Sequence, residues 1–125
     1  MENDVAGTLF ENNYGMAPIE AMTLIETFFA NELIRFRLQN KYHNKSGYWG
    51  FCYCYGLGVE FSISSGRGYL DYSLIINKEV IDLIQYDAQL NYISASSEKN
   101  IKYVLNMFKR FLFETKDVED KQTIH

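Results

Sequence analysis

The stretch from Tyr48 to Tyr55, Tyr-Trp-Gly-Phe-Cys-Tyr-Cys-Tyr, constrains the fold of this chain more than any other. Seven of its eight residues are aromatic or cysteine, and the chain's single tryptophan is among them. Aromatic residues favour strands, and a run without charge favours burial. The stretch therefore predicts a strand in the interior of a sheet, with cover on both of its faces. It says almost nothing about chemistry.

Two further strands are predicted after this run, and glycine-containing turns separate them. Residues 58–64 and residues 69–76 each alternate between apolar and polar side chains. Alternation with period two over consecutive hairpins predicts an antiparallel sheet with one covered face. The turn Ser65-Gly66-Arg67-Gly68 joins two strands instead of opening a helix, so its glycines indicate a hairpin and not a phosphate-binding loop.

Helices are predicted before and after these strands. Over residues 18–41, which begin at the only proline, apolar residues recur every three or four positions, with acids early and bases late. Residues 98–114 show the strongest helical periodicity, and Ser97 is placed to cap that helix. Residues 79–93 fit a short helix or more sheet. We favour sheet there, with a short strand at residues 90–93.

These elements predict a single α+β domain over residues 1–125. It is an antiparallel sheet of three to five strands, with N- and C-terminal helices packed on one face, the face that carries Val59, Phe61 and Ile63. Residues 1–16 and 115–125 are expected to be loose tails. The acidic N-terminus lacks an apolar signal segment, and no apolar stretch is long enough to span a bilayer. We expect a cytoplasmic protein that does not bind membranes.

Cysteine and histidine provide little basis for a metal site or a cofactor. Cys52 and Cys54 share one face of the predicted strand with Cα atoms roughly 6.5–7 Å apart, at the limit for a disulfide. We expect reduced, buried thiols. Only His43 and His125 are available to complete a zinc site, and His43 is expected at the C-terminus of the first helix, where the dipole favours it. We expect no metal and no cofactor.

The chain offers no catalytic constellation that we can identify. A nucleophile needs an imidazole or another base beside it, and neither histidine is placed to serve one. Glu60 and Asp71 fall on adjacent predicted strands and point to the polar face. Paired carboxylates can do acid–base work, but a solvated or partner-binding face explains them more simply. We therefore expect no catalytic residues and do not expect an enzyme.

The polar face of the sheet is the best candidate for binding a protein. Tyrosine is abundant in the chain, and it is enriched at protein interfaces because its ring buries area while its hydroxyl forms hydrogen bonds. Residues 46–98 hold six acids against two bases, which indicates a basic protein partner, while the net charge of −4 disfavours direct nucleic-acid binding. The residues predicted to bind the partner are Tyr48, Glu60, Ser62, Tyr69 and Asp71.

In size, acidity, α+β layout and lack of catalytic residues, the whole chain resembles the small immunity proteins that neutralise bacterial polymorphic toxins, including those of contact-dependent growth inhibition. The resemblance implies a cytoplasmic inhibitor, monomeric or homodimeric, that binds the C-terminal domain of one toxin, for which a nuclease is expected. It assigns no contact residues. Two alternatives stay open: a non-catalytic adaptor or self-associating structural protein, and a small ligand-binding domain or enzyme.

Overall fold

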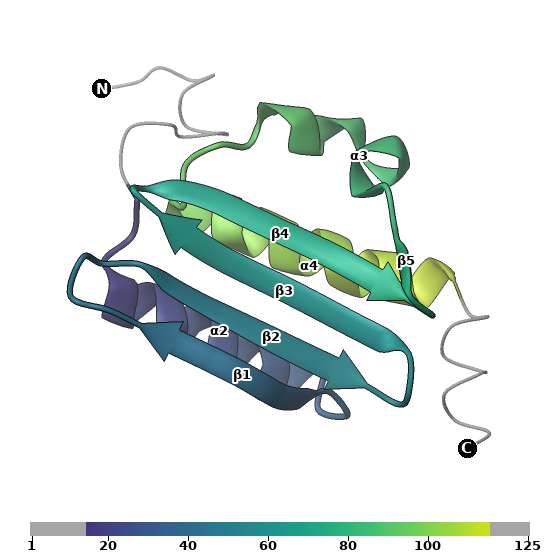
Figure 1. Ribbon diagram of the computed structural model, residues 1–125. Helices are drawn as coiled ribbons and strands as arrows, with labels where there is room; N and C mark the ends of the chain where they lie inside the picture. The colour runs from purple at the N-terminus through teal and green to yellow at the C-terminus, as the bar shows by residue number, and fades with distance from the viewer. Residues whose placement is uncertain (1–14, 116–125) are drawn as a thin grey trace.

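The protein forms two layers, a five-stranded antiparallel sheet and a pair of helices that cover one of its faces (Figure 1). The computed structural model describes residues 15–115. The strands lie in the order β1-β2-β3-β4-β5, so each is hydrogen-bonded to its neighbours in sequence. The strands are β1 (Arg37–His43), β2 (Trp49–Tyr55), β3 (Val59–Gly66), β4 (Tyr69–Ile76) and β5 (Glu79–Val80). The helices are α2 (Pro18–Glu32), α3 (Leu83–Tyr86), a 3₁₀ helix η1 (Ala88–Tyr92) and α4 (Glu98–Glu114).

The core lies between the sheet and the two long helices, as the alternation in β3 predicted. Phe61 in the middle of β3 stacks on Phe108 of α4, with ring centroids 4.0 Å apart. Phe29 of α2 stacks on Tyr53 of β2 at 3.7 Å. Because both helices pack on the side chains of this one face, the predicted α+β class and its helix-covered face are confirmed.

Helix α4 spans the residues that its periodicity predicted, 98–114. Its apolar face, including Leu105 and Phe108, is fully buried against the sheet. The Ser97 side chain caps the helix by accepting a hydrogen bond from the backbone N–H of Asn100, at 3.3 Å. Local signals sufficed here because the apolar stripe, the cap and the tertiary contact all favour the same element.

The predicted first helix, residues 18–41, is too long. Helix α2 ends at Glu32, and the chain turns through residues 33–36 into strand β1. Of the bases predicted to lie at the C-terminal end of this helix, Arg35 lies in the turn, and Arg37 and Lys41 lie in the strand. All seven residues of β1 are exposed, so no buried alternation marked it as a strand. It forms because the apolar strand β2 needs a hydrogen-bonding partner on its second edge.

The preference for sheet over residues 79–93 was also largely wrong. Only Glu79–Val80 pairs with β4, and residues 90–93 form no strand. Two aspartates explain the outcome, since Asp82 caps α3 by accepting from the N–H of Gln85 and Asp87 caps η1 by accepting from the N–H of Gln89. Short polar side chains of this kind compete with strand pairing for backbone groups. The segment runs beside β4 as a short helical arch (Figure 1).

The predicted loose tails lie outside the described residues, apart from Gly15, Met16 and Thr115 at their inner ends. The Met16 N–H donates to the carbonyl of Ser96 at 2.7 Å, and the Thr115 N–H donates to the carbonyl of Phe111 at 3.0 Å. Within the described part of the chain, the inner ends of both tails are therefore hydrogen-bonded to the domain.

Candidate functional site: the open face of the sheet

The sheet face opposite α2 and α4 has no helix over it within residues 15–115. We call it the open face. Strand register places four rows of side chains there, each row running across neighbouring strands. In order along the sheet, the rows are Arg37, Cys54, Glu60, Ile75 and Val80; Asn40, Cys52, Ser62 and Ser73; Tyr42, Gly50, Ser64 and Asp71; and Gly66 with Tyr69, which Tyr48 adjoins.

All five residues predicted to bind a partner lie on this open face. Glu60, Tyr69 and Asp71 are exposed, while Tyr48 and Ser62 are half-buried. Tyr69 has the most accessible ring of the set, with 66% of the residue exposed. The period-two alternation of β3 and β4 therefore predicted correctly which residues share this side of the sheet.

Two tyrosine rings cover glycines on the open face. A Cβ atom at Gly50 would collide with the ring of Tyr42, and one at Gly66 would lie 2.9 Å from Cε2 of Tyr48. Glycine is required at both positions because an aromatic ring occupies the space above the backbone. Arg67 fixes the second ring by donating from Nε to the hydroxyl of Tyr48 at 3.1 Å. The rings therefore form a pre-ordered aromatic edge beside a strip of small side chains.

The prediction that the aromatic run at residues 48–55 has cover on both faces is wrong, because one of its faces belongs to the open face. Strand β2 is interior in the strand order, but only its helix-facing side chains, such as Trp49 and Phe51, are buried among apolar neighbours. Cys52 and Cys54 are half-buried free thiols on the open face and not core thiols. The thiol of Cys52 donates to Oε1 of Gln39 at 3.2 Å.

The charges on the open face are balanced. Glu60 and Asp71 belong to different rows, because Glu60 pairs with Ile75 whereas Asp71 pairs with Ser64. Four residues along a strand separate the two carboxylates by roughly 13 Å. They therefore cannot share a proton or act on one bond as a close pair. Arg37 and Arg67 offset their charge on the same face.

The acidic surplus of residues 46–98 lies elsewhere. Asp82, Asp87 and Glu98 sit at helix starts in the 79–98 segment. Asp87 has a structural role, since its carboxylate accepts from the hydroxyl of Tyr103 at 2.8 Å and pairs with Nη2 of Arg110 at 2.7 Å. Burial, and then the hydrogen bond to Asp87, raise the pKa of Tyr103. This network ties η1 to α4.

His43 does not lie at a helix C-terminus, because α2 ends eleven residues earlier. It ends the exposed edge strand β1, opposite Trp49. His125 lies outside the described residues. Among residues 15–115, no three histidine, cysteine, aspartate or glutamate side chains gather where they could hold a metal ion.

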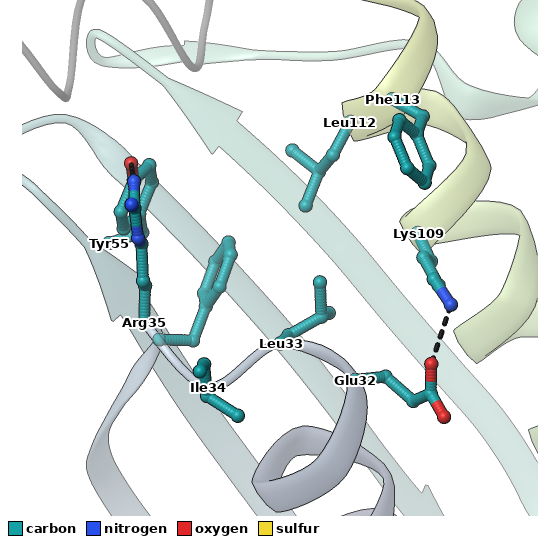
Figure 2. A pocket seen from close by; sticks show the side chains of 9 residues that line it. Glu32, Leu33, Ile34, Arg35, Tyr55, Lys109, Leu112 and Phe113 are labelled. Carbon is teal, nitrogen blue, oxygen red and sulfur yellow. Dashed lines mark hydrogen bonds and ion pairs between the residues drawn. The ribbon is translucent and has the colours of Figure 1, made fainter.

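Sequence reasoning missed a second surface, a pocket of about 320 Å³ beside the turn from α2 to β1 (Figure 2). We call it the turn pocket. It was missed because residues 33–36 were assigned to a helix, which hid the turn that forms one of its walls. Its lining residues are Glu32, Leu33, Ile34, Arg35, Phe36, Tyr55, Lys109, Leu112 and Phe113.

No helix within residues 15–115 has both the length and the apolar character needed to cross a membrane. Comparison of the chain with protein-family models, with curated protein sequences and with solved structures gives no match.

Proposed function

We propose that this protein is a non-catalytic inhibitor of the immunity-protein kind, which binds a bacterial toxin domain through the open face and blocks it. One observation carries the proposal: Tyr48, Glu60, Ser62, Tyr69 and Asp71 lie together on a sheet face that no described helix covers. Pre-ordered tyrosines beside polar groups are the usual composition of a protein-binding surface.

The shape of the open face suits a protein more than a small substrate. Strands of seven to eight residues across four neighbours give a surface of roughly 25 by 19 Å. That projected area, near 470 Å², is more than half of the ~800 Å² that one partner buries in a stable complex. The remaining contact would come from the rim, where the turns at residues 44–48 and 65–68 adjoin the face.

The charged side chains of the open face indicate which charges a partner surface would carry. Glu60 and Asp71, about 13 Å apart, each suit one lysine or arginine of a toxin surface that handles phosphates. Arg37 and Arg67 lie on the same face and suit acidic groups beyond that patch. The partner therefore presents separate basic groups in a mixed surface, and complementary pairing sets register and encounter rate more than affinity.

Self-association is the second candidate, and strand β1 is the observation that favours it. Its outer edge has no partner strand within residues 15–115, and an open edge can pair with another chain. Pairing of two β1 strands would bring the Arg37 and Lys41 side chains of both copies to one seam. These repulsions oppose a dimer. Light scattering of the isolated protein distinguishes this candidate from the first.

The test of the proposal is charge reversal on the open face. Glu60→Lys combined with Asp71→Lys, which sets like charges opposite the basic groups of the partner, is expected to weaken binding to the cognate toxin domain strongly and to reduce protection of cells from it. The matched control is Glu20→Lys combined with Glu79→Lys, which makes the same charge change at two exposed acids off the open face. Thermal melts must show both double variants folded. If the face variant binds and protects as well as the control, the open face is not the interface.

A further inference from the structure

The helical arch that follows β5 covers the outer edge of β4 only in part. At one end of this edge, the N–H of Leu70 donates to the carbonyl of Ser94 at 2.8 Å, and at the other end the N–H of Ile81 donates to the carbonyl of Leu74 at 2.9 Å. Between these two bonds the arch stands away from the strand (Figure 1), and a hollow of about 550 Å³ lies there. We call it the arch groove, and residues 70–73, 80–84, 90, 91 and 93 line it.

The backbone of Tyr72 faces the arch groove. In an antiparallel pair every second residue directs its N–H and C=O away from the neighbouring strand, so Tyr72 shares the outer edge of β4 with Leu70 and Leu74. The N–H of Tyr72 donates to Oδ1 of Asp71 at 3.0 Å. Because this N–H points to the outer edge, the carboxylate that accepts from it also lies over that edge. Asp71 therefore belongs to the open face and to the arch groove.

The arch groove combines apolar walls with negative charge. Val80 and Ile84 stay 74% and 46% exposed at its rim, although both are large apolar residues. Asp71 and Asp82 are its two charged residues, both are exposed, and none of the described residues that line it is basic. Within residues 15–115 neither aspartate forms an ion pair. The groove therefore suits a ligand that has an apolar stem, carries positive charge and donates hydrogen bonds.

We infer that the arch groove receives one arginine side chain of the toxin domain. The methylene stem of arginine lies on apolar surface while its charged end reaches polar groups, which matches the apolar walls of the groove. Its guanidinium carries five N–H donors in a planar fork, so it can bond to a carboxylate and to the outward carbonyl of Tyr72 together. Arginine is also among the residues that contribute most to the affinity of protein interfaces. Because Asp71 joins the two surfaces, a domain seated on the open face lies beside the groove.

The identity of the partner rests on the proposed function, whereas the affinity of the groove for arginine does not. The first arm of the test therefore contains no toxin. The full chain is titrated with N-acetyl-arginine N-methylamide and followed by amide chemical shifts. Saturable shifts are expected at residues 70–73 and 80–84, with a dissociation constant of about 1–10 mM, as for other small ligands with few contacts. The citrulline analogue has the same shape without the charge, and it is expected to bind about threefold more weakly or worse.

Matched variants separate the arch groove from general surface effects. Asp82→Asn removes one charge but keeps the cap of α3, because asparagine caps helices as well as aspartate does, and it is expected to weaken arginine binding by about two- to fivefold. Glu20→Gln removes an exposed acid of α2 outside the groove and is expected to leave binding unchanged. Ile84→Ala is expected to weaken binding about twofold or more, whereas Ile19→Ala, at another exposed isoleucine, is expected to have no effect.

The second arm measures binding of the toxin domain to the same variants. Asp82→Asn is expected to weaken it about threefold or more, and Glu20→Gln is expected to leave it unchanged. If the arginine probe gives no saturable shifts, or if its citrulline analogue or the Asp82→Asn variant binds equally well, the groove is not an arginine site. The open face then still stands or falls by its own charge-reversal test. If arginine binds but Asp82→Asn leaves toxin binding unchanged, the toxin does not use the groove.

Discussion

Phe108 and Phe113 form a natural comparison, because one helix carries the same side chain at a buried and at an exposed position. Phe108 is fully buried in α4 and stacks on Phe61 at 4.0 Å, with Phe36 at 5.5 Å edge-on. Phe108→Ala is therefore expected to cost about 4 kcal/mol from lost burial and the cavity, with about 1 kcal/mol more from the lost stack. Phe113 is 68% exposed, so Phe113→Ala is expected to cost less than about 1 kcal/mol.

Urea unfolding measures both free energies. A domain of this size has a total stability of about 6–19 kcal/mol, so the loss at Phe108 removes a large fraction of it. With a slope near 2 kcal/mol/M, the midpoint is expected to fall by about 2.5 M for Phe108→Ala and by less than about 0.5 M for Phe113→Ala. Equal midpoints for the two variants, at unchanged slope, would mean that α4 does not bury the face described above.

Three further predictions concern single contacts. Ser97→Ala is expected to cost about 1 kcal/mol because the cap of α4 is lost, and a denaturant midpoint unchanged from the parent would rule out that cap. Burial, and then the charge of Glu26, raise the pKa of Tyr53 to about 12. Because the folded state holds this proton more tightly than the unfolded state, the contribution of Tyr53 to stability is expected to be constant below pH 10 and to fall as the pH rises to 12. Tyr53→Phe is expected to flatten the decline in urea midpoints between those pH values. Asp87→Ala is expected to cost about 2–3 kcal/mol by freeing Arg110 and η1, and amide hydrogen exchange should rise first in residues 83–92; uniform exchange across the domain would contradict that local role.

The sequence was sufficient wherever local pattern and tertiary contact agree. Residues 98–114 and residues 69–76 form the elements predicted for them, because their periodic apolar positions are the positions that the core buries. The open face followed from the same alternation, since the residues opposite a buried set on a strand must share the other side. The residues predicted to bind a partner were placed on one surface for that reason.

The sequence was insufficient where an element forms to satisfy another element. Strand β1 has no apolar pattern of its own and forms because β2 needs a partner strand. The signal for β1 therefore lies in the sequence of β2 and not in residues 37–43. Assigning residues 33–41 to a helix also concealed the turn pocket, whose wall is the turn at residues 33–36. The arch over residues 81–93 depends on two aspartate caps, a signal that the apolar content of the segment obscured.

The two cysteines offer the most direct test of the central claim, that the open face binds a protein. Cys52 and Cys54 are the only cysteines of the chain, and both are half-buried free thiols in the middle of that face. Mass spectrometry can follow their alkylation by iodoacetamide in the free protein and in a complex with the proposed toxin partner. The account predicts that binding slows alkylation of both thiols at least tenfold, whereas a stable complex in which they react as fast as in the free protein would contradict it.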